Sequence, residues 1–331
     1  MMDRSKDEPH HSTTLLIDGE SLSIEDVVHV ARDRKEAALS AGAVDRVQQC
    51  RAWVDRVVNE GKLTVYGLTT GYGSLSEVSI APEDAETLTR NMIMSHSAGV
   101  GEPLDEDVVR ATMLIRANTL AKGYSGIRLE VLGTLLAMLN KGVHPVMPEK
   151  GSLGASGDLA PLAHLALALS RDTEGGEAFY QGRRMTVEEA MRQAGIEQLT
   201  LKPKDGLALT NGATVSAALA ALILHDAELL VKNAEIALAM SLEAMRGVSD
   251  AFHAKVHLVR GHEGQRSCAA NVLRLVEGSE LLDSTNRVQD AYSLRCAPQV
   301  IGAVRDSLAY VRMVVGAEIN AATDNPLIFL D

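Results

Sequence analysis

Aromatic residues are scarce in this sequence: Phe, Trp and Tyr together make up 3% of its 331 residues. Runs rich in aromatic and β-branched side chains, which favour strands, are therefore few. Alanine, leucine, glutamate and arginine are plentiful, and these residues favour helices. With 46% hydrophobic residues, the chain has enough apolar side chains for a large core. We expect a mostly all-α protein.

Cysteine is also rare. The three cysteines, Cys50, Cys268 and Cys296, are scattered, and they form neither a Cys-x-x-Cys pair nor a Cys/His cluster. The segment Gly261–Gln265 contains His262-Glu263 but lacks the His-Glu-x-x-His spacing of a zinc site. We therefore expect no metal, and the odd, dispersed cysteines favour a reducing, cytoplasmic location.

Positive charge is in deficit, because 32 Lys and Arg face 44 Asp and Glu, a net charge of −12. This balance argues against a nucleic-acid partner or an anionic membrane surface. The apolar run nearest to membrane-spanning length, Thr214–Leu230, is interrupted by charged residues. Residues 1–12 are polar and lack the apolar core of a signal peptide, so we expect a disordered tail.

Two helices can be placed from local patterns. Ser23-Ile24-Glu25-Asp26 resembles a capping box and predicts a helix over Ile24–Leu39. A nearly unbroken helical pattern covers Ala213–Arg246, and a helix of that length is typical of a bundle. Residues 175–186 predict a small hairpin with Gln181-Gly182 at its tip.

The segment Lys150–Pro161 is the most informative stretch. It has three glycines within seven residues, which permit tight turns that other residues avoid. Asp158 is typical of a helix N-cap, and Pro161 would fall in the first helical turn. Ala155-Ser156-Gly157 is therefore expected as a small-residue loop at a helix N-terminus, the positive end of the helix dipole.

A loop bent this sharply can bring the amide nitrogen of Gly157 onto the carbonyl carbon of Ala155. Ring closure, with loss of water from that step and from the Ser156 side chain, would give a methylidene-imidazolone, an electrophile that no ordinary side chain supplies. Ala-Ser-Gly alone is a weak signal, since an ordinary loop before a helix has the same composition.

The whole segment Lys150–Pro161 resembles the signature of the histidine and phenylalanine ammonia-lyase family, whose members build 4-methylidene-imidazol-5-one (MIO) from their own Ala-Ser-Gly. The resemblance implies a long helical bundle and a smaller N-terminal α-rich domain that carries the MIO loop and the hairpin. We expect that domain over residues 13–208, and the first part of a truncated central bundle over 209–331. The family continues further, so the resemblance covers about two-thirds of a typical member.

The glycine- and tyrosine-rich segment Val65–Ser74 resembles the family's mobile lid. The resemblance makes Tyr66 a catalytic tyrosine. A phosphate cradle is excluded, because there is no Gly-Lys-Ser/Thr. His96 stands in a Ser-His-x-Ala-Gly-Val-Gly motif that the family places beside the substrate's side chain.

Two asparagines complete the motifs on this side of the site. Asn211, in Gly-Leu-Ala-Leu-Thr-Asn-Gly, is implied by the resemblance to donate a hydrogen bond to the ring's carbonyl oxygen, where negative charge develops. Asn before Gly is otherwise a common turn or cap. Asn325, in the closing Thr-Asp-Asn-Pro motif, is implied to assist carboxylate or ring binding.

The segment Val288–Gln299 is the second strong motif. Gln289, Tyr292 and Arg295 are spaced i, i+3, i+6 and would share a face if helical, although spacing alone also fits a polar loop. The resemblance implies that Arg295 clamps the substrate carboxylate, that Tyr292 assists proton transfer and that Gln289 holds the substrate.

The implied reaction converts L-histidine into trans-urocanate and ammonia, a step of histidine catabolism. It needs a base over the β-carbon, and Tyr66, with an ordinary tyrosine pKa of ~10, must be activated by its surroundings. The resemblance further implies a homotetramer in which neighbouring subunits share each active site.

Two alternatives stay open. Thr69-Thr70 and Ala213-Thr214 favour a tyrosine or phenylalanine ammonia-lyase, or a 2,3-aminomutase, with the same prosthetic group, whereas Cys296 favours the histidine branch. The second alternative is an inactive, truncated family member, a helical scaffold with the motifs but no competent site.

Overall fold

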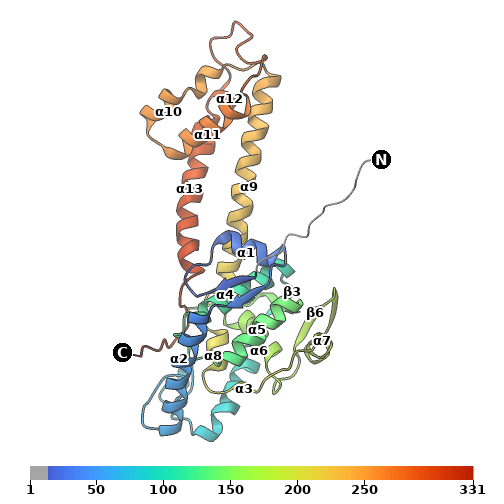
Figure 1. The fold of residues 1–331 in the computed structure, drawn as a ribbon, viewed down its shortest axis with the longest axis vertical. Helices are drawn as coiled ribbons and strands as arrows, with labels where there is room; N and C mark the ends of the chain where they lie inside the picture. The colour runs from blue at the N-terminus through green and yellow to red at the C-terminus, as the bar shows by residue number, and fades with distance from the viewer. Residues whose placement is uncertain (1–13, 331) are drawn as a thin grey trace. The chain divides into compact units, whose positions relative to one another are not determined.

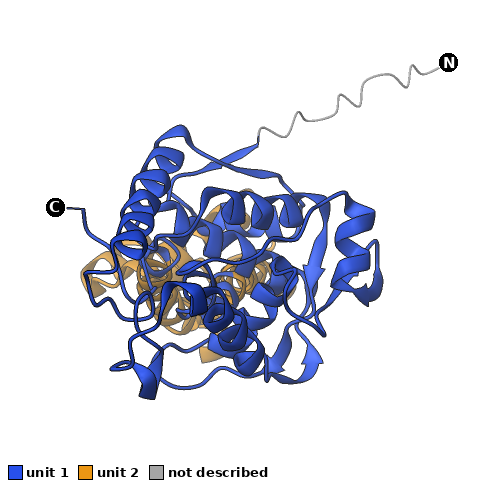
Figure 2. Ribbon diagram, turned by 90° about the horizontal axis from the view of Figure 1, so that it is seen from below, with its two compact units in different colours: residues 1–221, 316–331 blue, residues 222–315 orange. Residues whose placement is uncertain are grey.

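The computed structural model describes residues 14–330, so the expected tail over residues 1–12 lies outside the described residues. The described chain is mostly helical, which confirms the predicted all-α class (Figure 1). It forms two compact units, shown in Figure 2. Unit 1 comprises the described residues up to Ala221 and those from Gly316 onward; unit 2 is Leu222–Val315.

Unit 1 is a cluster of helices around one buried helix. From Val108 to Ala121, every residue of α4 is buried, and α4 contacts α1, α2 and α5. Helix α6 contacts α3 and α8, and these three helices position the site described below. The helices are α1 (Ile24–Ala31), α2 (Ala41–Glu60), α3 (Ala85–His96), α4 (Glu106–Ala121), α5 (Leu129–Lys141), α6 (Leu159–Leu169), α7 (Val187–Ala194) and α8 (Asp205–Thr210).

Short strands join these helices. The predicted hairpin exists as β6 (Glu177–Tyr180) and β7 (Arg183–Thr186), and a third strand, β4 (Val143–Pro145), pairs with β6. At the hairpin tip, Gln181 and Gly182 both have positive φ, as a type I′ turn requires. The other pairs are β3 (Val100–Pro103) with β5 (Pro148–Lys150), and β1 (Leu15–Ile17) with β2 (Ala37–Leu39).

The predicted capping box is present, but its helix is shorter than expected. The Asp26 amide donates to Ser23 Oγ at 3.0 Å, and the Ser23 amide donates to Asp26 Oδ2 at 3.3 Å. Helix α1 ends at Ala31 and does not reach Leu39, because Ala37–Leu39 pairs in parallel with β1. For residues 37–39, pairing with a strand remote in sequence is therefore favoured over continuation of the helix.

Unit 2 contains most of the longest helix. Helix α9 (Thr214–Ala244) begins in unit 1 and is followed by α10 (Ala254–Arg260), α11 (Glu263–Leu275), α12 (Tyr292–Arg295) and α13 (Ala297–Glu318). Leu242, Phe252 and Cys268 belong to its hydrophobic core. Within unit 2, Arg305 Nε on α13 lies 2.6 Å from the buried carboxylate of Glu235 on α9.

One helical stretch of the described residues, Asp205–Ala244, is long and apolar enough to cross a membrane by length and composition alone. Of its most apolar window, 67% is buried inside the protein. Core helices of folded proteins pass the same test, so length and composition do not by themselves indicate a membrane span.

The last described residues return to unit 1. We expected the first domain to end at residue 208, whereas unit 1 runs to Ala221 and also includes the residues from Gly316 onward. The Asn320 side-chain amide donates to the Leu22 carbonyl at 2.8 Å and accepts from the Leu22 backbone amide at 2.9 Å. The Ile328 backbone amide donates to the Tyr124 carbonyl at 2.9 Å. These contacts join residues that are far apart in sequence, which local patterns do not reveal.

His144 on β4 is buried beside a buried cation. Arg110 Nη1 lies 3.0 Å from His144 Nε2, and the Arg110 guanidinium also donates to the carbonyls of Val30 and Leu139. Burial and the neighbouring arginines lower the pKa of His144 from 6.5 to about 3. The ring is therefore neutral in the folded protein and accepts a hydrogen bond from Arg110.

We expect this histidine to destabilise the fold in acid. Between pH 6.5 and about 3 the unfolded chain binds a proton at His144 that the folded chain does not. Its stabilising contribution is therefore complete above pH 6.5 and is lost as the pH falls, at up to about 1.4 kcal/mol per pH unit. Urea unfolding across this window should show a smaller pH slope for His144→Gln than for the wild type. The exposed control His29→Gln should keep the wild-type slope; an unchanged slope in His144→Gln would contradict the assignment.

Candidate active site

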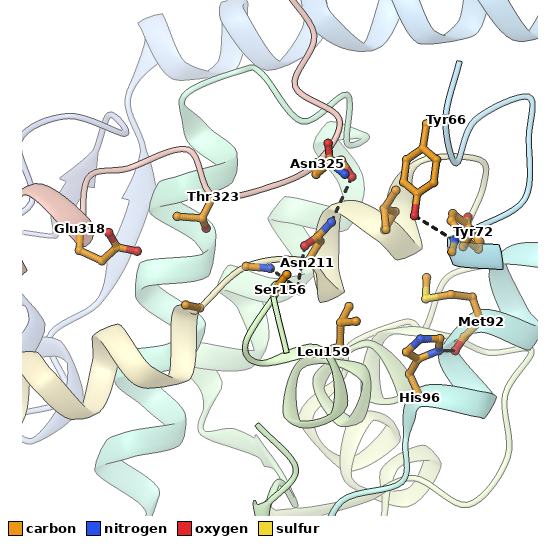
Figure 3. A pocket seen from close by; sticks show the side chains of 15 residues that line it. Tyr66, Tyr72, Met92, His96, Ser156, Leu159, Asn211, Glu318, Thr323 and Asn325 are labelled. Carbon is orange, nitrogen blue, oxygen red and sulfur yellow. Dashed lines mark hydrogen bonds between the residues drawn. The ribbon is translucent and has the colours of Figure 1, made fainter. Parts of the chain in front are cut away.

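A cavity of about 580 Å³ opens within unit 1, a volume in the range of small-molecule sites. Five chain segments line it: the Tyr66 loop, the end of α3, residues 155–159, residues 207–213 and residues 318–325 (Figure 3). Segments separated by up to about 260 residues of sequence therefore meet around one cavity. Polar and apolar groups both contribute to the walls.

The predicted tight bend is present at the cavity wall. The Leu153 amide donates to the Gly157 carbonyl at 2.7 Å, which closes a short loop. Gly157 has a φ of +86°, and a Cβ added there would lie 3.3 Å from Ala213 Cβ. Helix α6 begins at Leu159, directly after this loop. Glycine is thus required at 157 both for its backbone conformation and for the close approach of the next segment.

Asp158 has a different role from the one predicted. It stands at the N-cap position of α6, but its side chain makes no capping hydrogen bond to that helix. The fully buried carboxylate instead accepts from Ser152 Oγ at 2.5 Å and from the Ser216 amide at 2.9 Å. Ser216 lies in the first turn of α9, so Asp158 satisfies an unpaired amide of α9 rather than of α6. It thereby ties the bend to the start of α9.

Ser156 is held by the turn between α8 and α9. Its Oγ donates to Asn211 Oδ1 at 2.7 Å and accepts from the Gly212 amide at 3.1 Å. Asn211 Nδ2 in turn donates to the Asn325 carbonyl at 3.1 Å (Figure 3). Three residues that the motifs singled out, Ser156, Asn211 and Asn325, therefore form one hydrogen-bonded chain at the cavity, and Ala155 lines the cavity beside them.

Two tyrosines stand on the opposite segment. The Gly73 amide donates to the Tyr66 phenol oxygen at 3.1 Å, so the Tyr66 hydroxyl proton is available to another acceptor. Tyr72 packs edge-on against Tyr66 with ring centres 6.5 Å apart. Burial raises the pKa of Tyr72 to about 12, against the opposing effect of a hydrogen bond with Thr89. Tyr72 is therefore harder to deprotonate than an ordinary tyrosine, which disfavours Tyr72 as a base.

His96 closes one end of the cavity from the last turn of α3. Its Nδ1 lies 2.8 Å from the Met92 carbonyl, which can only accept, so Nδ1 carries a proton and a neutral ring presents Nε2 as an acceptor. Met92 and Leu159 add apolar wall beside it. Sequence reasoning missed Tyr72, Met92 and Leu159, although Tyr72 and Leu159 both lie in segments that a motif marked.

The motif Val288–Gln299 lies in unit 2. Gln289 and Arg295 line a cavity of about 340 Å³ within unit 2, and the Arg295 guanidinium lies over the Tyr292 ring, 4.2 Å from its centre. Tyr292 is 70% exposed. The Nε of Arg295 is buried without a hydrogen-bond partner among the described residues. None of the three residues lines the unit 1 cavity as the described chain forms it.

A mostly helical fold with a serine-bearing glycine bend, facing a tyrosine and a histidine across a cavity of small-molecule size, defines an enzyme scaffold rather than a binding or structural module. No group of three or more His, Cys, Asp or Glu residues that could hold a metal occurs between residues 14 and 330. The sequence profile of the aromatic amino acid lyases matches residues 22–331. The chain belongs to this family.

Relatives with assigned names agree with the family. The chain is 57% identical over 319 residues to a histidine ammonia-lyase of Caldanaerobacter subterraneus and 55% identical over 317 residues to one of Alkaliphilus oremlandii. These alignments cover 96% and 95% of this chain but 62% of each relative. The chain therefore spans about 62% of the length of these relatives.

Solved structures share the fold. Tyrosine aminomutase from Streptomyces globisporus superposes with a TM-score of 0.88 at 36% identity, covering 96% of this chain and 63% of that one. Histidine ammonia-lyase from Trypanosoma cruzi superposes with a TM-score of 0.86 at 37% identity, covering 96% and 60%. The similarity in fold thus includes both lyases and aminomutases.

Proposed function

We propose that this chain carries the electrophile-bearing part of an ammonia-lyase that converts L-histidine into trans-urocanate and ammonia. The observation that carries the proposal is the Ser156 side chain, which Asn211 and Gly212 hold at the wall of a cavity shared with Tyr66 and His96. Histidine is favoured as substrate because relatives at 57% and 55% identity are histidine ammonia-lyases.

The residues present fit an MIO group formed from Ala155-Ser156-Gly157. Gly157 has a positive φ and a close contact with Ala213, both of which disfavour a side chain, and the Ser156 hydroxyl already has one acceptor and one donor. When formed, the group supplies an electrophilic carbon. The helix N-terminus that follows the bend favours negative charge on its oxygen.

Tyr66 is the proposed base. The Gly73 amide fixes its phenol oxygen at the cavity wall. Once the phenol proton has passed to another acceptor, that oxygen can take a proton from the β-carbon of a substrate bound between Tyr66 and Ser156. His96, with Met92 and Leu159 beside it, would receive the substrate's side chain. The second N–H of Asn211 remains for a developing oxyanion, since the first donates to Asn325.

We further propose that Gln289, Tyr292 and Arg295 act on a site of a neighbouring subunit in a cytoplasmic homotetramer. The unpartnered Nε of Arg295 is suited to a substrate carboxylate. Within unit 2, α9 and α13 expose large apolar side chains, among them Leu230 at 68% and Met313 at 64%. Exposed apolar helix faces of this kind favour association with further copies.

A tyrosine or phenylalanine lyase or aminomutase is the second candidate. The similarity to Streptomyces globisporus tyrosine aminomutase favours it. The Thr69-Thr70 pair gives this candidate little support in the structure. Thr69 Oγ1 bonds the backbone of Val65 and Leu63, and neither threonine lines the cavity where a substrate would bind. An inactive family member is the third candidate, because the proposed carboxylate clamp is absent from the unit 1 cavity.

Two measurements on the purified chain separate these candidates. Intact mass spectrometry should show a chain lighter by two water molecules than the sequence requires. Turnover of histidine, tyrosine and phenylalanine, followed for conjugated acids and β-amino acids, should give urocanate from histidine alone. An unmodified mass would favour the inactive member, and β-tyrosine or β-phenylalanine would favour the aminomutase.

A further inference from the structure

Lys204 and Asp324 form an ion pair sealed inside unit 1. Lys204 Nζ lies 2.6 Å from Asp324 Oδ2, and neither side chain is exposed at all. Neither residue lines the cavity, and the proposed chemistry does not use them. Removing two charges from water costs free energy that their mutual attraction only partly offsets. Stability alone therefore does not explain why this ion pair is buried here.

The ion pair is joined to Ser156 by consecutive hydrogen bonds. Asp324 Oδ1 accepts from the Asn325 amide at 2.7 Å, so both carboxylate oxygens are engaged. The Asn325 carbonyl accepts from Asn211 Nδ2 at 3.1 Å, and Asn211 Oδ1 accepts from Ser156 Oγ at 2.7 Å (Figure 3).

The Asn325 carbonyl decides which way the Asn211 amide points. If that amide were turned over, its oxygen would face the carbonyl oxygen of Asn325, and two acceptors would oppose each other. Only with Nδ2 toward Asn325 does Asn211 present its oxygen to the Ser156 hydroxyl. The orientation of Asn211 therefore depends on where the Asn325 carbonyl is held.

We infer that Lys204 and Asp324 are positioning residues, which hold the Asn325 carbonyl so that the Asn211 amide keeps the Ser156 hydroxyl in the geometry from which it leaves as water when the ring forms. The inference deepens the proposed function and rests on it for the step that is aligned. Atoms balance as in the proposed closure: the Gly157 nitrogen bonds to the Ala155 carbonyl carbon, and two water molecules leave. The pair itself gains and loses no atoms.

A second contact from the same segment reinforces this alignment. A Cβ added at Gly212 would lie 2.4 Å from Thr323 Oγ1, so Thr323 packs directly on Gly212. The Gly212 amide is the other group that holds Ser156. Thr323 and Asn325, on either side of Asp324, thus set both hydrogen bonds of the serine.

Removing the pair should leave the chain folded. The segment is anchored independently before Asp324, where Asn320 bonds Leu22, and after it, where Ile328 bonds Tyr124. Lys204→Met with Asp324→Asn removes both charges of the pair together, and asparagine keeps an acceptor for the Asn325 amide. The buried Arg116 loses the attraction of Asp324 but keeps its hydrogen bond to the Ala208 carbonyl. Any displacement is then confined to the neighbourhood of Asn325.

The test follows ring closure by intact mass in freshly synthesised chain, sampled over time. In the double variant Lys204→Met/Asp324→Asn we expect the rate of water loss to fall on the order of 100-fold, the effect of misplacing reacting groups by ~1 Å. The matched control is Asp205→Asn. Asp205 is an equally buried carboxylate of unit 1, 2.6 Å from Arg128 Nε, with no hydrogen bond to Asn211 or Asn325. We expect the ring to form in Asp205→Asn at the wild-type rate, even if the melting temperature of this variant is lower.

A wild-type rate in the double variant overturns the inference, and so does a slowing in both variants that follows their loss of melting temperature. Crystal structures of the wild type and the double variant give a readout independent of closure. The Asn325 carbonyl should leave hydrogen-bond reach of Asn211 in the variant, and an unchanged contact overturns the inference. If the wild type never loses water, the proposed function fails, while the crystal structures still decide the positioning role.

Discussion

Replacement of Ser156 by alanine is expected to abolish lyase activity, with a loss on the order of 10³-fold or more, as for removal of a group on which the chemistry depends. Alanine lacks the hydroxyl that must leave as water, so the electrophilic carbon cannot form. The cavity should keep its shape, because Ser156 is only partly buried and the bend is held by the Leu153–Gly157 hydrogen bond. Activity and intact mass are measured on the same preparation.

The matched control is Ser21→Ala, which removes an exposed hydroxyl that bonds Asp18 and does not line the cavity. It should retain both the wild-type activity and the mass deficit of two water molecules. Substantial turnover by Ser156→Ala, in a preparation with the full sequence mass, would refute the electrophile.

Two inactive chains are expected to restore activity when they assemble together, if each site takes its unit 1 and unit 2 residues from different copies. Ser156→Ala removes the electrophile from the unit 1 set, and Arg295→Gln removes the carboxylate clamp from the unit 2 set. With random association of two copies per site, at most about a quarter of the sites would combine two intact sets. Each variant alone should be inactive.

Co-expression with two different affinity tags and sequential purification isolates the mixed assemblies, whose urocanate production is then measured. The control mixture combines Ser156→Ala with Tyr66→Phe. Both changes lie in the same cavity of unit 1, so no site regains an intact set and activity should stay absent. Activity in the control, or none in the first mixture, would contradict sharing between copies.

The helical class followed from composition, and several local elements followed from short patterns. The Ser23–Asp26 capping box and the Gln181-Gly182 hairpin tip appear as expected, because both are stabilised by neighbours in sequence. The overextended helix after Ile24 shows the limit. Residues 37–39 take the strand conformation because β1 lies beside them, and nothing local to them encodes that partner.

The candidate site was predictable to the extent that motifs marked it. Tyr66, His96, Ala155, Asn211 and Asn325 all line the unit 1 cavity. Met92 was not predictable, because an apolar residue on a helix looks the same whether it faces a core or a cavity. Leu159 lies within the marked segment Lys150–Pro161, but its apolar side chain gave no reason to single it out. Arg295 belongs to unit 2 and does not line the unit 1 cavity, so its role at the substrate carboxylate stays a prediction.

By itself, the sequence determined the helical class, the family and the glycine-dependent bend around Ser156, since each depends on residue types or on neighbours along the chain. The tertiary structure alone decided that Asp158 serves α9 rather than α6, and that the buried pair of Lys204 and Asp324 reaches Ser156 through Asn325 and Asn211. The physical reason is the same in both cases. A carboxylate binds whichever unpaired donor the fold brings within hydrogen-bond distance, and that donor belongs to a segment remote in sequence.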